Sequence, residues 1–152
     1  MRRIAVLATL FVLAFPAVAG ATIFINRSMF GVSLGATMKQ VRGRFGRPDT
    51  VGSNSRGPVW RYVRRGFLLT FSSKTHRVIE LFTANPHQRT PGGLGVGSTE
   101  KAVKRHVRGI QCRSVAGLPG IHCVILNPSH TRGTDFHVTS GRVDNVFIEI
   151  VA

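Results

Sequence analysis

A pattern of fifteen residues occurs twice in this 152-residue chain, and no other feature restricts the fold as strongly. Residues 31–45 and residues 93–107 both follow G-Φ-x-Φ-G-x-T-x-x-x-V-x-x-x-Φ, where Φ is an apolar residue. The alternating apolar residues predict a short extended segment, and the second glycine predicts a turn. The threonine stands where a helix N-cap accepts hydrogen bonds from first-turn N–H groups. Each copy therefore predicts a turn that leads into a short helix.

The turn and cap residues of the two copies are Gly35 with Thr37, and Gly97 with Thr99. In the first copy Gln40 follows Thr37 by three residues, which is the spacing of a capping box. The apolar residues after each threonine recur at helical spacing and predict one buried helix face.

Strand-like segments follow each predicted helix. Their composition and the glycine-containing turns between them predict antiparallel hairpins. They cover residues 59–63, 67–71 and 77–83 after the first helix, and residues 111–114, 122–126, 135–139 and 145–151 after the second. The sequence thus predicts an α+β fold of two tandem repeats, 22–90 and 91–152, each a short helical segment followed by about three antiparallel strands.

The first 21 residues have the order of a secretory signal peptide. Arg2 and Arg3 precede an apolar run, and small residues end it, with cleavage expected after Ala19 or Ala21. The uncharged stretch from residue 4 to residue 25 is also long enough for an uncleaved membrane anchor. We expect a secreted, periplasmic or cell-envelope protein.

The two cysteines, Cys112 and Cys123, are close together in the chain. In an exported protein such a pair predicts a disulfide. A metal site built from His106, Cys112, His122 and Cys123 is the alternative, but this spacing fits no common zinc pattern. The sequence predicts the disulfide and no metal.

The charge of the chain is one-sided. Lys and Arg number 21 against 6 Asp and Glu, a net charge of +15, of which +13 remains if Arg2 and Arg3 leave with the leader. Such a surface favours anionic partners, here an anionic wall polymer or a membrane surface. A solvated basic surface without a ligand is the alternative. Export would separate the chain from chromosomal nucleic acid, which makes nucleic acid a disfavoured partner.

Nothing in the sequence predicts catalysis. The six acidic residues are scattered, and neither a serine nor a cysteine has the setting of an activated nucleophile. The glycine-rich run 92–97 lacks the Lys-Ser/Thr of a phosphate-binding loop. We expect a protein that is not an enzyme and needs no cofactor.

One cluster combines aromatic residues with arginines, a composition that protein interfaces and anionic ligands both favour. Its members are Trp60, Arg61, Tyr62, Arg64 and Arg65. On a strand Trp60, Tyr62 and Arg64 would share one face. The alternative is that Trp60 and Tyr62 fill the core between sheet and helix.

The first copy also resembles a known family. Its glycine-threonine start, the helix end Phe45-Gly46-Arg47-Pro48-Asp49, and the segments 60–62 and 67–71 resemble the SmpA/OmlA domain of bacterial envelope proteins. Two such units in tandem are similar to the architecture of the beta-lactamase inhibitory protein. The chain lacks the lipid-attached cysteine typical of SmpA/OmlA proteins. The resemblance implies a non-catalytic module that binds another envelope or extracellular protein. The basic charge supports the alternative, a module that binds a polyanion at a cell wall or membrane surface.

Overall fold

The computed structural model describes residues 22–151 as two β-sheets, two α-helices and one 3₁₀ helix. The predicted signal peptide, residues 1–21, lies outside the described residues. The elements in chain order are β1 (Ile23–Phe24), β2 (Ser28–Met29), β3 (Val32–Ser33), α1 (Met38–Phe45), β4 (Thr50–Asn54), β5 (Gly57–Tyr62), η1 (Val63–Arg65), β6 (Phe67–Phe71), β7 (Val78–Thr83), α2 (Glu100–His106), β8 (Gln111–Arg113), β9 (Ile121–Leu126), β10 (Arg132–Thr139) and β11 (Arg142–Ile150).

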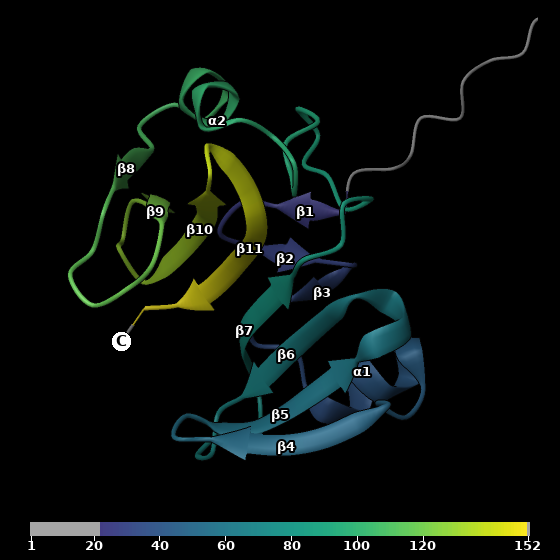
Figure 1. The fold of residues 1–152 in the computed structure, drawn as a ribbon. Helices are drawn as coiled ribbons and strands as arrows, with labels where there is room; N and C mark the ends of the chain where they lie inside the picture. The colour runs from purple at the N-terminus through teal and green to yellow at the C-terminus, as the bar shows by residue number, and fades with distance from the viewer. Residues whose placement is uncertain (1–21, 152) are drawn as a thin grey trace, which may run out of the picture.

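The larger sheet contains eight strands in the order β4-β5-β6-β7-β11-β10-β9-β8. Every neighbouring pair is antiparallel, and the sheet curls strongly between its two edges (Figure 1). The central pair is β7 with β11, in which Leu81 lies opposite Ile148. This pairing joins the strands that follow α1 to the strands that follow α2 in one sheet.

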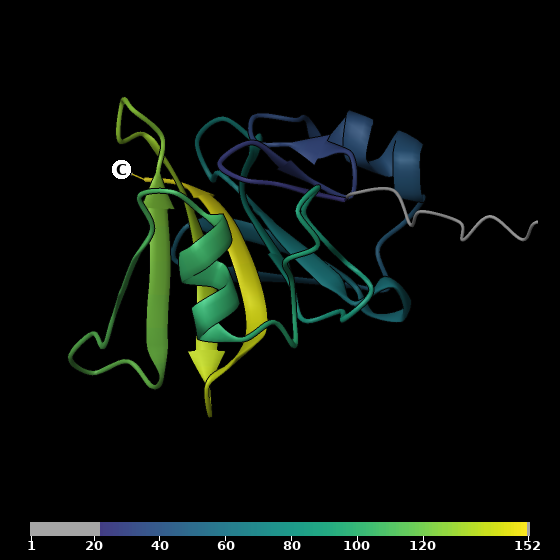
Figure 2. The same cartoon turned by 90° about the horizontal axis from the view of Figure 1, so that it is seen from above.

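The core lies on one face of this sheet. Successive strands place Trp60, Leu69, Leu81 and Ile148 in a row on that face, and each is at most 4% exposed. Each helix packs against this face through one fully buried valine, which is Val41 in α1 and Val103 in α2. The three-stranded sheet β1-β2-β3 lies between the two helices and contributes buried residues to the same core (Figures 1 and 2).

The turns before the two helices have the same backbone contacts. Gly35 and Gly97 adopt φ of 86° and 90°, a conformation that favours glycine. The N–H of Gly35 donates to the carbonyl of Val78 on β7, and the N–H of Gly97 donates to the carbonyl of Val143 on β11, both at 2.7 Å. The two turns are thereby attached to the two central strands of the sheet.

Threonine caps the N-terminus of each helix. The Thr37 hydroxyl accepts from the N–H of Gln40 at 3.2 Å, and the Gln40 side chain accepts from the N–H of Thr37, which completes a capping box. The Thr99 hydroxyl accepts from the N–H of Ala102 at 3.1 Å. These bonds satisfy N–H groups that have no partner within the helix.

The predicted fold class is wrong. The structure is mostly β, with 14% of it helical, and does not consist of two tandem helix-plus-strand repeats. The strands form one continuous eight-stranded sheet, and β1–β3 form a second sheet ahead of the first helix. The sequence pattern does not predict β4, because Thr50-Val51-Gly52-Ser53-Asn54 is rich in residues that disfavour strands.

No helix within residues 22–151 has both the length and the apolar character needed to cross a membrane.

Candidate functional site

The two aromatic residues of the predicted binding cluster lie in the core. Trp60 is 4% exposed and Tyr62 is 2% exposed. The Trp60 ring contacts Phe71 edge-on at 4.7 Å between centroids, and the Tyr62 ring stacks on Phe67 at 4.9 Å. The Tyr62 hydroxyl donates to the carbonyl of Gly46 at 3.1 Å, and burial raises the pKa of this phenol. Both side chains therefore occupy the space between sheet and helix.

The three arginines of the cluster do not share one surface. Arg61 is exposed on the opposite face of β5 from Trp60 and Tyr62. The strand ends at Tyr62, so Arg64 and Arg65 belong to the 3₁₀ helix η1. Arg64 is paired with Asp49 at 3.5 Å. The structure thus separates Arg61 from the other two arginines.

The face of the large sheet that points away from the helices, called here the open face, carries a second set of side chains. Hydrogen-bond register places one residue from every strand in a single row across this face. From one edge to the other the row reads Thr50, Arg61, Leu68, Phe82, Phe147, Asp135, Val124 and Gln111.

An aromatic pair occupies the middle of this row. Phe82 of β7 and Phe147 of β11 meet edge-to-face, with 4.8 Å between ring centroids. Both rings are partly exposed, and neither belongs to the core cluster. Leu68 lies beside the pair in the row and is also outside the core cluster. The centre of the open face is therefore apolar and accessible.

An ionic network borders the aromatic pair on one side. The Arg56 guanidinium bonds to Glu80 at 3.1 Å, to Glu149 at 2.8 Å and to the carbonyl of Ile150 at 2.9 Å. The Thr70 hydroxyl donates to Glu80 at 3.2 Å. Arg56 follows β4 in the chain, so it ties the β4–β5 turn to β7 and to the end of β11.

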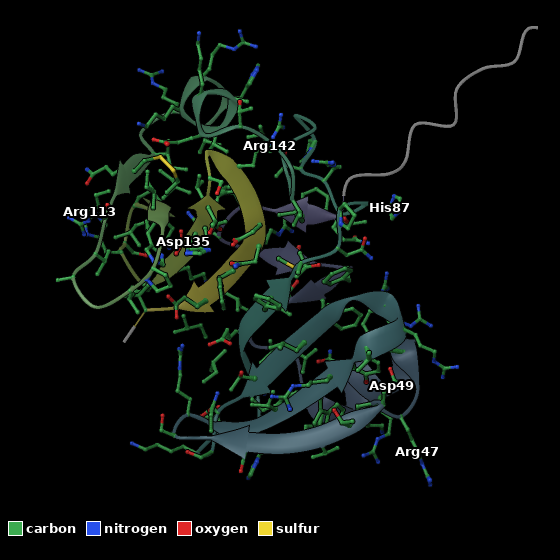
Figure 3. All side chains as sticks on the ribbon, viewed as in Figure 1. Arg47, Asp49, His87, Arg113, Asp135 and Arg142 are labelled. Carbon is green, nitrogen blue, oxygen red and sulfur yellow. A yellow bond between two sulfur atoms is a disulfide. The ribbon has the colours of Figure 1, made fainter. Side chains whose placement is uncertain are left out.

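Two histidine–aspartate pairs border the aromatic pair on the other side. His122 Nδ1 lies 2.6 Å from Asp135 Oδ2, and His137 Nδ1 lies 2.6 Å from Asp144 Oδ1. The two imidazole rings are 4.8 Å apart. Asp135, which is in the central row, lies on β10 (Figure 3). The Nε2 atom of His122 is buried and has no hydrogen-bond partner among residues 22–151.

The protonated form of His137 is favoured by its surroundings. Its Nε2 lies 2.7 Å from the carbonyl of Pro119, and this contact, followed by the bond to Asp144, raises the pKa of His137 above 6.5 although burial opposes the shift. Burial would also raise the pKa of Asp144, but hydrogen bonds from His137 and Thr139 lower it below 3.8. Only the imidazolium donates from both ring nitrogens, as this arrangement requires.

We therefore expect part of the stability to depend on the charge of His137. A raised folded-state pKa contributes stability that is complete below pH 6.5 and is lost as the pH rises through the folded value. Urea unfolding at pH 5.5 and pH 8.5 measures how much the free energy of unfolding decreases between the two pH values. This decrease should be smaller in His137→Gln than in the natural protein. The control is His87→Gln, because His87 is exposed and lies well away from Asp135, which is on the strand that carries His137 (Figure 3). Equal decreases in all three proteins would contradict the role of His137.

Two arrangements in the described part of the chain bear on catalysis and on metal binding. Asp135 orients the His122 imidazole as it would orient a general base, and the free ring nitrogen of His122 is buried. Cys112 and Cys123 form a disulfide, as the sequence predicts, so neither sulfur is a thiolate ligand. The carboxylate of Glu100 lies near both sulfurs, and the group contains no other potential metal ligand from residues 22–151.

Comparisons with known proteins show the fold but no family. No protein-family model matches the chain, and no curated protein matches it. The structure is similar to that of a DUF4309 family protein (YjgB) from Bacillus subtilis, with a TM-score of 0.57 and 16% identity over 83% of this chain and 88% of that chain.

Two longer proteins share the fold as well. A cysteine-rich secretory protein from Staphylococcus aureus gives a TM-score of 0.51 and 12% identity, covering 77% of this chain and 44% of that chain. An extracellular protein containing a SCP domain from Bacillus anthracis gives a TM-score of 0.55 and 8% identity, covering 95% of this chain and 50% of that chain. The present chain spans about half the length of these two proteins or less.

The sequence contains a signal for the apolar centre of the open face. Leu68, Phe82 and Phe147 each stand between two residues that point to the core. A strand with one solvated face alternates apolar and polar residues, whereas consecutive apolar residues place apolar side chains on both faces. The runs at 67–69, 81–82 and 146–148 therefore indicated a second apolar surface.

Proposed function

We propose that this protein is a non-catalytic binding module that acts outside the cytoplasm, and that the open face of its sheet receives another extracellular protein. The observation that carries the proposal is the accessible Phe82–Phe147 pair, which lies at the centre of the row and outside the core cluster. Partly exposed aromatic rings at the centre of a broad surface are typical anchors of protein interfaces.

The charge of the open face points to the chemistry of the partner. Four of the six acidic residues, Glu80, Asp135, Asp144 and Glu149, lie on or beside this face, although the chain as a whole is strongly basic. All four are already paired, two with Arg56 and two with a histidine. Their charge is thus compensated, and the face suits a protein segment that inserts apolar side chains against Phe82 and Phe147 and places neutral polar groups at its rim.

An extracellular location is supported by three observations. The sequence begins with a predicted leader, the two cysteines form a disulfide, and two proteins that share the fold are a secretory and an extracellular protein. The resemblance to SmpA/OmlA domains and to the beta-lactamase inhibitory protein agrees with a binding role and remains a prediction.

Replacing the aromatic pair is expected to weaken this binding strongly. A photo-crosslinking residue at position 68 should first capture the partner from culture supernatant or envelope extract, so that the affinity can be measured with purified partner. The double variant Phe82→Ala/Phe147→Ala should then raise Kd at least about 100-fold, because central aromatic anchors contribute roughly 2 kcal/mol or more each and every 1.4 kcal/mol is about tenfold.

The matched control is Val51→Ala/Val63→Ala, which truncates two apolar residues that are 66% and 65% exposed but lie away from the open face. This control should leave Kd unchanged. Circular dichroism of each variant would verify that it is folded. An unchanged Kd in the folded Phe82→Ala/Phe147→Ala protein would remove the open face from the function.

A further inference from the structure

Five arginines gather around the C-terminal end of α1, on the side of the molecule that carries the helices. The group is called here the arginine patch, and every member is exposed; Lys39 lies beside it and lines a depression with Arg42. Three come from α1 and the residues after it, and two from η1. They are Arg42, Arg44, Arg47, Arg64 and Arg65. Figure 3 shows Arg47 and Asp49 at this end of the molecule, near α1 and β4.

Aromatic rings hold three of these guanidinium groups in place. Arg42 lies over the Trp60 ring at 5.2 Å from its centroid. The Phe45 ring has Arg44 at 5.6 Å and Arg65 at 5.4 Å. A guanidinium that already rests on a ring loses little further freedom when a ligand binds, so the patch is preorganised.

The positive charge of the patch is largely uncompensated. Arg64 is paired with Asp49 at 3.5 Å, and Arg44 donates to the carbonyl of Phe30 at 2.9 Å. Within residues 22–151, Arg42, Arg47 and Arg65 form no ion pair. Three of the five arginines, Arg47, Arg64 and Arg65, border a depression of about 370 Å³ that Phe45, Asp49 and Tyr62 also line.

We infer that the arginine patch binds a linear extracellular polymer that carries phosphate groups. A guanidinium matches the oxygens of a phosphate with two parallel hydrogen bonds, which an ammonium cannot make, and the patch presents five guanidinium groups. Five cations exceed what one phosphate can neutralise, which favours a chain of successive phosphates over a single ion. This site is separate from the open face and goes beyond the proposed protein-binding function.

The test compares two double variants that remove equal charge. Arg47→Gln/Arg65→Gln alters the patch, and Lys101→Gln/Arg108→Gln alters exposed cations on and just after α2, which form no ion pair among the described residues. The probe is linear polyphosphate, with binding followed by calorimetry at 50 mM and 300 mM salt. We expect the patch variant to raise Kd 10- to 30-fold at 50 mM salt and the α2 variant to raise it less than 3-fold.

The salt dependence gives a second readout. Each lost phosphate contact should reduce the slope of log K against log salt by about 0.7, as for single-stranded polyanions, so the patch variant should lose about 1.4. The single variant Arg47→Gln keeps the Arg65–Phe45 contact and should still weaken binding severalfold. It therefore tests the patch even if the double variant fails to fold.

Comparison of the variants and further ligands distinguishes recognition of a phosphate polymer from its alternatives. Equal weakening by the two double variants would overturn the proposal, because net charge alone would then account for binding. Polyglutamate that binds as tightly as polyphosphate would overturn recognition of phosphate. Inorganic phosphate that binds as tightly per mole as the polymer would overturn the polymeric ligand. Binding confined to phosphatidylglycerol vesicles would assign the patch to a lipid surface instead.

Discussion

Trp60→Ala is expected to lower the free energy of unfolding by about 3–5 kcal/mol, the range found when a large aromatic side chain is deleted from a core. Trp60 is only 4% exposed, lies edge-on to Phe71 and is covered by the Arg42 guanidinium. The residues around the resulting cavity belong to the sheet and to α1, so they can close it only in part. Urea denaturation at constant pH measures this change.

The control for this prediction is Val51→Ala. Val51 lies on the neighbouring edge strand β4 directly opposite Trp60, but its side chain is 66% exposed. It should change the free energy of unfolding by less than about 0.5 kcal/mol. A stable Trp60→Ala protein that has lost its partner would contradict the structure, because it would show Trp60 to be a binding residue and not a core residue.

The sequence could not decide where Trp60 points. Period-two alternation assigns Trp60 and Tyr62 to one face of β5, but it does not say which face meets the helices. The strand also ends at Tyr62, because the chain turns into η1 and Gly66 closes that turn in the left-handed region with φ of 68°. Arg64 therefore does not share a face of the sheet with Trp60 and Tyr62, although strand geometry predicted that it would.

Local features were easier to predict than the pairing of distant strands. Threonine caps and glycine turns depend on a few adjacent residues, and the structure places Thr37 and Thr99 at helix N-termini. The pairing of β7 with β11 joins residues more than 60 positions apart in the chain, and no local pattern encodes it. This contact turns the strands into a single sheet and explains why the predicted tandem architecture is wrong.

The same long-range pairing creates the candidate site. Phe82 and Phe147 belong to β7 and β11 and meet only because these two strands are neighbours at the centre of the sheet. The sequence could show that each strand has an apolar residue on its second face, but not that the two rings touch. The arginine patch likewise depends on η1 lying beside the end of α1, where Arg65 contacts Phe45.

The open face and the arginine patch differ in chemistry and lie on different sides of the sheet. The open face combines an apolar centre with most of the acidic residues, and the patch combines uncompensated arginines with an aromatic base. Binding at the first should depend weakly on salt, whereas binding at the second should weaken steeply as salt is raised. The two proposals can therefore be tested independently in one protein.

Removing the disulfide is expected to lower the free energy of unfolding by about 3 kcal/mol. Cys112 and Cys123 are 11 residues apart in the chain, and the chain-entropy model assigns about this value to a loop of that length. The bond joins β9 to β8, an edge strand of only three residues whose Cys112 lies opposite Cys123. The test is urea denaturation of Cys112→Ala/Cys123→Ala.

The natural protein treated with a reductant is the matched control for this double variant. Reduction also removes the loop constraint but keeps both sulfur atoms, including that of Cys123, which is fully buried. If the loop constraint carries the stabilisation, the reduced protein and the double variant should agree within about 1 kcal/mol, the remainder reflecting the volume lost at position 123. A double variant as stable as the oxidised protein would show that β8 is held by its hydrogen bonds to β9 alone.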